Sequence, residues 1–231
     1  MNISVFKNYL DELGVAYDDD KLSKLNIYYN YLVSENEKYN LTAITSLEDV
    51  YLKHFYDSLT ICKVIDLNGV SSLCDVGSGA GFPGVVLKIF YPHLKLCLVD
   101  SLNKRINFLK DLCSLLNLSD VSFYHMRAEE FALKNRNMYD VVTARAVANL
   151  NTLLEYCVPI VKVGGYFIPL RGRDDLSLIK NAMNTLNVNL VSSSEFFLPL
   201  ECSYRCILKF RKVKDNLKYP RKFSEIKKKP L

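Results

Sequence analysis

The chain has 231 residues, of which 49% are hydrophobic, and this composition is typical of a globular protein with a sizeable core and excludes a largely disordered chain. Its apolar runs are shorter than the ~20 residues of a membrane span and its first residues lack the layout of a signal peptide, so we expect a cytosolic protein without a membrane partner. The seven cysteines form no CxxC pair and lie mostly in apolar runs, which favours buried thiols in a reducing compartment and no metal site.

The net charge of +5 is distributed unevenly along the chain. From Arg205 onward, eleven Lys and Arg and two acids give the last 27 residues a charge of +9, which leaves −4 for the rest. A basic tail on a mildly acidic body favours a polyanionic partner, most simply nucleic acid. The alternative is a solvated, partly disordered terminus.

The first third of the chain is predicted to be helical. Apolar residues recur at helical spacing over residues 3–37, and Asp18-Asp19-Asp20 has the acidic character of a helix start. The pattern breaks at Asn40-Leu41-Thr42, resumes at Ser46 and continues from His54 to Ile65. We therefore expect an N-terminal helical cap over residues 1–66.

A glycine-rich loop follows. Ser72–Val76 is a short apolar run of β character, Gly77, Gly79, Gly81 and Gly84 come directly after it, and residues 85–90 have a helical pattern. Glycines in such a strand–turn–helix unit allow positive φ and close approach of a ligand, and the helix start offers free N–H groups. The sequence therefore predicts a nucleotide-like ligand at this loop.

The glycine run has two interpretations. Gly77-x-Gly79-x-Gly81 fits the loop of S-adenosylmethionine (SAM) methyltransferases, whereas Gly79-x-Gly81-x-x-Gly84 fits dinucleotide-binding folds. Asp75 favours the first, because a carboxylate before the loop would repel a pyrophosphate and attract the ammonium of a methionine moiety. Asp100 ends the next predicted strand, 19 residues after Gly81, where an acid can meet ribose hydroxyls. An ordinary strand-to-helix turn, with Asp100 as a helix cap, is the alternative.

After the loop, strands and helices alternate. Strands are predicted over 95–100, 121–125, 139–143 and 166–170, with helices over 102–116, 128–133, 149–158 and 174–186, and Gly164-Gly165 is expected to form the turn before strand 166–170. Two final strands, 188–197 and 203–211, are expected to form a hairpin. This order predicts an α/β fold with a doubly wound, mostly parallel sheet and an antiparallel C-terminal strand, as in the Rossmann-like class I SAM-dependent methyltransferases. We expect the SAM-binding domain to span residues 67–213 and the basic tail residues 214–231.

Motifs spread along the chain give a more specific resemblance. They are Asn40-Leu41-Thr42, His54 with Asp57-Ser58, the glycine loop 75–84, Asp100-Ser101 with Lys104-Arg105, Arg127-Ala128-Glu129-Glu130, Arg145-Ala146 and Tyr219-Pro220-Arg221-Lys222. Together they resemble the RsmG (GidB) family, SAM-dependent methyltransferases that modify N7 of a guanine in 16S ribosomal RNA. The resemblance covers about residues 20–222. Arg171 stands where the family commonly has Lys, and the tail after Lys222 departs from the family's usual Pro-Gly-Thr-Pro run.

The resemblance implies SAM as cofactor and 16S rRNA or the small ribosomal subunit as partner. It implies cofactor contacts at Gly77, Phe82, Ala128, Glu129 and Arg145. The glycine loop and the end of the next strand add the candidates Asp75, Gly79, Gly81, Asp100 and Ser101. Alternatives remain for several of these: Phe82 as a core residue, Ala128-Glu129 as the first turn of a helix, and Arg145 as a structural ion pair.

The chemistry expected of such an enzyme needs no general base, because guanine N7 carries a lone pair and no proton. Arg145 and His54 are the candidates for positioning the substrate, although His54 can equally be a helix-packing residue. Candidate phosphate contacts are Lys104, Arg105, Arg171, Arg173, Arg221 and Lys222. We expect a monomer without a metal ion.

Three other functions are compatible with parts of the pattern. The first is a SAM enzyme that acts on another RNA, a protein side chain or a small molecule. The second is an NAD(P)-dependent oxidoreductase, against which the absence of a substrate domain counts. The third is a non-catalytic RNA-binding protein that retains only the nucleotide fold.

Overall fold

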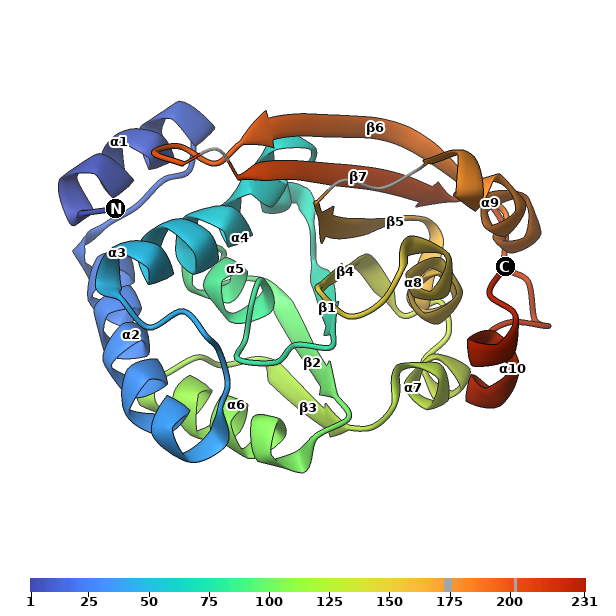
Figure 1. Cartoon of the computed structure of the whole chain (residues 1–231), viewed down its shortest axis with the longest axis horizontal. Helices are drawn as coiled ribbons and strands as arrows, with labels where there is room; N and C mark the ends of the chain where they lie inside the picture. The colour runs from blue at the N-terminus through green and yellow to red at the C-terminus, as the bar shows by residue number, and fades with distance from the viewer. Residues whose placement is uncertain (173–175, 202) are drawn as a thin grey trace.

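The computed structural model describes residues 1–172, 176–201 and 203–231, and its centre is a seven-stranded sheet (Figure 1). The strands are β1 Ser72–Val76, β2 Lys95–Asp100, β3 Val121–His125, β4 Tyr139–Arg145, β5 Val161–Arg171, β6 Val188–Phe197 and β7 Tyr204–Lys212. They lie in the order β3-β2-β1-β4-β5-β7-β6. Strands β1 to β5 pair in parallel, and β7 is antiparallel to both β5 and β6. The predicted doubly wound sheet with an antiparallel C-terminal hairpin is confirmed.

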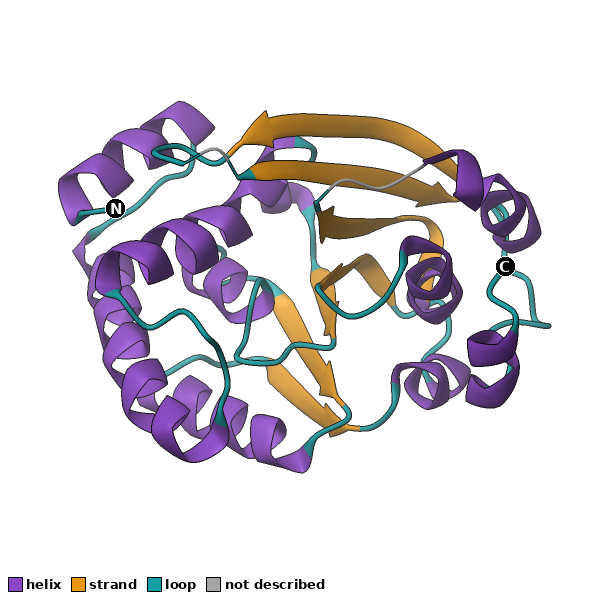
Figure 2. Ribbon diagram, viewed as in Figure 1, coloured by secondary structure: helices purple, strands orange, loops and turns teal. Residues whose placement is uncertain are grey.

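Helices cover both faces of the sheet (Figure 2). Before β1 come α1 Ile3–Leu13, α2 Asp19–Tyr39, α3 Leu47–Val50, the π-helix η1 Tyr51–Tyr56, α4 Asp57–Leu59 and the 3₁₀ turns η2 Thr60–Lys63 and η3 Leu67–Gly69. After β1 come α5 Gly84–Phe90, α6 Asn103–Leu115, α7 Ala128–Lys134, α8 Leu150–Cys157, η4 Val158–Ile160, η5 Leu176–Ile179, α9 Lys180–Leu186 and α10 Phe223–Lys228.

Successive side chains of a strand point to opposite faces, and this alternation divides the core in two. In β2, Leu96 and Leu98 pack into a cluster with α1, α2, α5 and α6, whereas Cys97 and Val99 pack into a second cluster with α7, α8 and α9. The first cluster joins the N-terminal helices to the sheet without a break. The predicted cap therefore shares its core with the rest of the chain, and its boundary at residue 66 stays a prediction.

The caps of the N-terminal helices follow from their sequence. The Asp18 carboxylate accepts a hydrogen bond from the Lys21 N–H at the start of α2, and Asn40 ends that helix in the left-handed conformation with φ 49°. Ser46 caps α3 in the same way as Asp18 caps α2. From residue 47 the chain stays helical to Lys63, but η1 is wound as a π-helix, a form found often at functional sites.

One local prediction is wrong. Gly164 and Gly165 do not form a turn before a strand: they lie inside β5, where the register with β4 shifts between Tyr139 and Val141 and Gly164 has φ +87°. The register shift shows that the pair forms a bulge. A side chain at Gly165 would not fit there, because its Cβ would lie 2.6 Å from the Asp140 carbonyl oxygen. The tail, for which a solvated, partly disordered terminus was the alternative, forms the short helix α10. The first two residues of the predicted helix 174–186 lie outside the described residues.

None of the helices in the described ranges combines the length and apolar character that crossing a membrane requires.

Candidate active site

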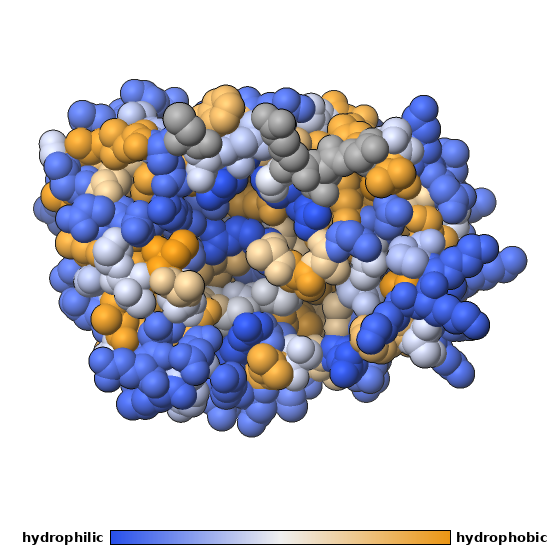
Figure 3. All heavy atoms as spheres, in the orientation of Figure 1, coloured by the Kyte–Doolittle hydropathy of each residue, from blue (hydrophilic) through white to orange (hydrophobic). Residues whose placement is uncertain are grey.

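A first cavity of about 390 Å³ opens at the carboxyl ends of β1 and β2. This is the edge at which doubly wound sheets bind ligands, and the volume suits a nucleotide-sized molecule. Figure 3 shows the molecular surface in the orientation of Figure 1, with a hollow near the middle of the view and hydrophilic side chains around it. The predicted cofactor residues in its lining are Gly77, Asp100, Ser101, Ala128 and Glu129.

Asp100 is fixed at the floor of this cavity. Its side chain is buried, its Oδ2 accepts a hydrogen bond from the Gly79 N–H at 2.9 Å, and its Oδ1 accepts one from the Leu102 N–H at 2.9 Å. Arg105 Nη1 lies 3.3 Å from Oδ2. The carboxylate therefore holds the glycine loop in place, and because a carboxylate oxygen can accept more than one hydrogen bond, Oδ1 can also receive a ribose hydroxyl.

Gly77 is where the backbone must come close to a neighbour. Its φ is +73°, and a Cβ there would lie 2.4 Å from Val147 Cγ2. Ala146, at the end of β4, also has a positive φ of 55°, which is uncommon for a residue with a side chain. Both turns together shape the cavity wall between β1 and β4.

A second cavity of about 450 Å³ adjoins the first, and Ala146 lines both. It lies between the π-helix, the end of β4 and the start of β7. Its charged and polar lining side chains are Lys53, His54, Asp57, Arg145, Arg171, Glu201, Ser203 and Arg205.

Arg145 connects three groups in this second cavity. Nη1 donates to the Lys53 carbonyl at 2.9 Å and to Asp57 Oδ2 at 3.1 Å, and Nη2 lies 3.1 Å from His54 Nδ1. The guanidinium also lies over the Phe82 ring, 5.2 Å from its centroid. The predicted alternative of a structural ion pair is thus present, and the same residue also faces the second cavity. It does not line the first.

The protonation state of His54 follows from these contacts. His54 Nδ1 lies 3.1 Å from Arg145 Nη2, which can only donate, and 3.1 Å from the Lys53 carbonyl oxygen, which can only accept, while Nε2 lies 2.9 Å from Thr42 Oγ1. Burial, together with the charge of Arg145, lowers the pKa of His54 to about 3. The imidazole is therefore neutral at physiological pH, and its face stacks on Phe82 with ring centroids 4.3 Å apart.

Asp57 and Glu201 supply the acids of the second cavity. The buried Asp57 carboxylate bridges two arginines, since Oδ1 accepts from Arg205 Nε at 3.0 Å. Glu201 Oε2 pairs with Lys53 at 3.0 Å, whereas its Oε1 is buried without a hydrogen-bond partner in the described part of the chain. Burial favours the neutral acid, but hydrogen bonds from Ser203 and Lys53 outweigh it and lower the pKa of Glu201.

Asp75 and Phe82 do not take the positions expected of cofactor contacts. Asp75 shares a strand face with Leu73, so its side chain points toward α5 and not into the cavity, and its Oδ2 accepts from the Gly84 N–H at 2.9 Å. Burial raises the pKa of Asp75 to about 7, although Gly84 and Arg145 oppose the shift. Phe82 is a core residue between His54 and Tyr28, as the alternative held. Asp75 and Phe82 therefore stabilise the glycine loop from the side of the protein core.

Gly79 and Gly81 contribute through the backbone only. Neither lines the first cavity, and a side chain at Gly81 would meet the Tyr28 hydroxyl at 2.5 Å. The Tyr28 hydroxyl of α2 donates to the Ala80 carbonyl. The lack of a side chain at Gly81 therefore lets α2 contact the loop backbone directly.

The predicted phosphate contacts fall into separate places. Lys104 donates to the Tyr39 carbonyl at 2.8 Å, Arg105 pairs with Asp100 in the first cavity, and Arg171 lines the second cavity. Arg221 pairs with the buried Glu155, and the side chain of Lys222 is exposed. Arg173 lies outside the described residues. Ribosomal RNA contact by any of these remains a prediction.

Several residues of the two cavities were not assigned a role from the sequence. They are Lys53, Asp57, Glu201 and Arg205 in the second cavity and Arg127, Tyr156 and Phe223 in the first. Asp57, three residues after His54, and Arg127, directly before Ala128-Glu129, were visible as parts of motifs. The others come from segments far apart in the chain, and only the fold brings them together. Among the described residues there is no group of three or more His, Cys, Asp or Glu side chains that could hold a metal ion.

Comparison with known proteins gives a consistent result. A family profile described as rRNA small subunit methyltransferase G, with the short name GidB, matches residues 21–198. A Bacillus cereus protein named ribosomal RNA small subunit methyltransferase G is 50% identical over 228 residues, which cover 96% of this chain and 95% of that protein. A Bacillus anthracis protein of the same name has the same identity and coverage.

Solved structures are similar in fold at low sequence identity. A SAM-dependent methyltransferase from Aquifex aeolicus aligns over 78% of this chain and 98% of its own, with a TM-score of 0.56 and 16% identity. TYW2 of M. jannaschii, in complex with AdoMet, aligns over 63% of this chain and 71% of its own, with a TM-score of 0.53 and 13% identity. The sheet and its covering helices thus have the methyltransferase fold.

Proposed function

The chain belongs to the family described as rRNA small subunit methyltransferase G, and from this premise we propose that it transfers the methyl group of SAM to N7 of a guanine in 16S ribosomal RNA. The family membership makes it a methyltransferase and sets aside the oxidoreductase alternative. We place its action in the cytoplasm, as a monomer that acts on the RNA of the small ribosomal subunit.

One observation carries the proposal: two cavities of suitable size meet at Ala146. A methyl transfer needs a cofactor site and an acceptor site that share a boundary, because the acceptor must reach the methyl carbon in line with the sulfur. The first cavity has the features of the cofactor site, namely a glycine loop, the acid Asp100 and the backbone at Ala128-Glu129. SAM supplies an electrophilic methyl group there, and the second cavity is left for the base.

The residues of the second cavity suit a guanine. Its Watson–Crick edge carries N–H donors at N1 and N2, and Glu201 Oε1, which has no hydrogen-bond partner among the described residues, is an acceptor for them. Arg145 and the neutral His54 supply fixed donors and a ring at the same cavity. Such a site holds a base that has been turned out of its RNA structure, as enzymes that modify bases require.

No general base is needed for the transfer. Guanine N7 attacks with a lone pair that is already free, so no proton has to leave, and positioning supplies much of the rate. The low pKa of His54 agrees with a role in positioning and not in proton transfer.

The test is transfer of labelled methyl from SAM to small-subunit particles that lack the modification, with naked 16S RNA assayed in parallel. The product is mapped by strand cleavage at N7-methylguanine. We expect label at a single guanine of the 16S RNA. Binding of SAM without transfer to either substrate would contradict the proposal and leave the chain with only a nucleotide-binding fold.

A further inference from the structure

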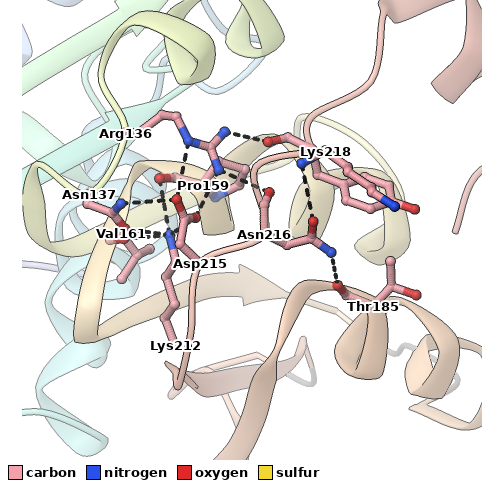
Figure 4. A network of polar contacts seen from close by, with 10 residues as sticks. Arg136, Asn137, Pro159, Val161, Thr185, Lys212, Asp215, Asn216 and Lys218 are labelled. Carbon is pink, nitrogen blue, oxygen red and sulfur yellow. Dashed lines mark hydrogen bonds and ion pairs between the residues drawn. The ribbon is translucent and has the colours of Figure 1, made fainter.

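The C-terminal segment after β7 is held firmly against the body of the protein. Figure 4 shows the first part of this attachment, in which Arg136 is the central donor. Its Nη2 lies 2.9 Å from Asp215 Oδ1 and 3.0 Å from the Asn216 carbonyl. Lys212 Nζ pairs with the same Asp215 at 2.8 Å, and Asn216 Nδ2 donates to the Thr185 carbonyl at 2.7 Å. The chain is thereby fixed where it leaves the sheet.

A second attachment lies a few residues further on. Arg221 reaches Glu155 of α8 with three donors: its backbone N–H at 3.0 Å, Nε at 2.8 Å and Nη2 at 2.6 Å. Glu155 is fully buried, and a buried carboxylate with a two-point guanidinium partner is a strong and geometrically specific contact. Ile226 of α10 is buried in the second core cluster. These contacts fix the position of α10 beside α7 and α8 (Figure 1).

This attachment brings Phe223 to the first cavity. Phe223 is the first residue of α10 and belongs to the lining, together with Arg127, Ala128 and Glu129 at the start of α7. The Arg127 guanidinium lies over its ring, 4.7 Å from the centroid. With 40% of its surface exposed, Phe223 keeps a large apolar area open toward the cavity, although α10 has a hydrophobic core position available at Ile226.

We propose that Phe223 is a cofactor-binding residue, and that the C-terminal segment places its ring against the adenine base of SAM. The inference rests on the proposed function, because it takes the first cavity as the cofactor site. The Ala128-Glu129 backbone can offer a base only polar contacts, whereas the Phe223 ring offers an apolar surface on which the base can stack. The Arg127 guanidinium lies over the ring and limits its rotation. The basic tail is thus part of the cofactor site.

The test measures binding of S-adenosylhomocysteine by calorimetry, independently of methyl transfer. We expect Phe223→Ala to weaken binding by about tenfold, within the range of base–aromatic stacking, and Phe223→Tyr to stay within about twofold of the wild type. Leu217→Ala is the matched control, because Leu217 is in the same segment, is 82% exposed and does not line the cavity. This control should bind as the wild type does.

A second measurement does not depend on the stability of Phe223→Ala. The chain contains no tryptophan, so Phe223→Trp introduces a single fluorophore at the cavity. We expect its emission to change with S-adenosylhomocysteine along a saturation curve that agrees with calorimetry, whereas Leu217→Trp should not respond. Equal affinity of the wild type and Phe223→Ala, or a silent Phe223→Trp that still binds, would overturn the proposed contact. A wild type that binds neither SAM nor S-adenosylhomocysteine would instead refute the cofactor assignment itself.

Discussion

At the scale of single residues, Arg145 contacts several groups of the second cavity at once. It contacts His54 Nδ1, pairs with the buried Asp57 and faces the cavity proposed for guanine. Because Asp57 is also held by Arg205, loss of Arg145 does not leave that carboxylate without a partner. The arrangement separates the effect of Arg145 on the acceptor site from its effect on the fold.

We therefore predict that Arg145→Ala lowers methyl transfer by about 100-fold, the effect of misplaced reacting groups, while S-adenosylhomocysteine affinity stays within about threefold of the wild type. Initial rates with ribosomal particles and calorimetry measure the two quantities. Arg211→Ala, at an exposed arginine of β7, is the control and should change neither. If cofactor binding falls as far as the rate does, Arg145 belongs to the cofactor site and the division into two cavities is wrong.

Asp75 allows a prediction about pH. Its folded-state pKa of about 7 is raised above the usual 3.8 by burial, so the folded protein binds a proton that the unfolded chain has released. The stability that this proton contributes is complete below about pH 4 and is lost as the pH rises through 7. Asp75→Asn keeps an acceptor for the Gly84 N–H and does not ionise.

We expect the unfolding free energy of Asp75→Asn, relative to the wild type, to increase by about 2–3 kcal/mol between about pH 5 and pH 8. Urea denaturation at the two pH values measures it. Because the carboxylate faces α5 and not the cavity, S-adenosylhomocysteine affinity should change little. A large loss of affinity would restore the role that the sequence suggested, a contact with the methionine ammonium.

At the scale of elements, the turns after β1 and β4 act together. Gly77 has φ +73° and no room for a side chain beside Val147, whereas Gly79 has φ +57° and its nearest neighbour would be 3.8 Å away. Alanine at either site therefore carries the cost of a left-handed conformation, roughly 1–2 kcal/mol, but only Gly77→Ala also displaces the turn after β4.

We predict that Gly77→Ala weakens S-adenosylhomocysteine binding by more than about tenfold and that Gly79→Ala weakens it less, because only the first pushes Val147 out of place. Val147→Ala in the Gly77→Ala background should restore part of the loss. The three variants and the wild type are compared by calorimetry. Without any rescue, the loss at Gly77 is due to backbone strain alone and the two turns are independent.

The elements that the sequence predicted are those with strong local patterns. Strand 72–76 and the alternation that follows agree with the structure to within two residues at most element ends, apart from β5, which starts five residues before its predicted start, because period-two and helical spacing are local properties. The π-helix over Tyr51–Tyr56 was not predicted, since every residue in it except Lys53 is buried and the segment has no periodicity that separates an α-helix from a π-helix. The bulge at Gly164 and the short helix α10 depend on partners in other strands and in α8.

The same distinction between local sequence patterns and contacts made by the fold applies to the candidate site. Gly77, Asp100 and Ala128-Glu129 were predicted because each follows a strand at the carboxyl edge of the sheet, and they line the first cavity; their contact with the cofactor stays a prediction. Asp75 does not line the first cavity, because strand alternation turns its side chain toward α5, and its predicted cofactor contact stays untested. Glu201, Arg205 and Phe223 come from segments that carry no motif, and only their folded positions identify them.

At the scale of the whole molecule, the N-terminal helices share a hydrophobic core with the sheet and its covering helices. Leu25, Tyr28 and Leu32 of α2 are fully buried in the cluster that also contains residues of α5 and α6. Exposing three such side chains costs roughly 5–9 kcal/mol, which is comparable to the ~5–15 kcal/mol stability of a typical domain.

We therefore predict a single unfolding transition, with coincident urea curves from far-UV circular dichroism and tyrosine fluorescence, and no stable fold for a chain that begins at residue 67. Two separated transitions, or a shortened chain with native dichroism, would show that the cap over residues 1–66 is an independent unit.

The central claim is that the cofactor occupies the first cavity and presents its methyl group at Ala146 to a base in the second. The most direct measurement is a crystal structure of the chain with S-adenosylhomocysteine. We predict the adenine between Ala128-Glu129 and Phe223, the ribose at Asp100, and the sulfur beside Ala146 on the side of Arg145 and His54. A sulfur that points away from the second cavity, or a cofactor bound inside it, would contradict the account.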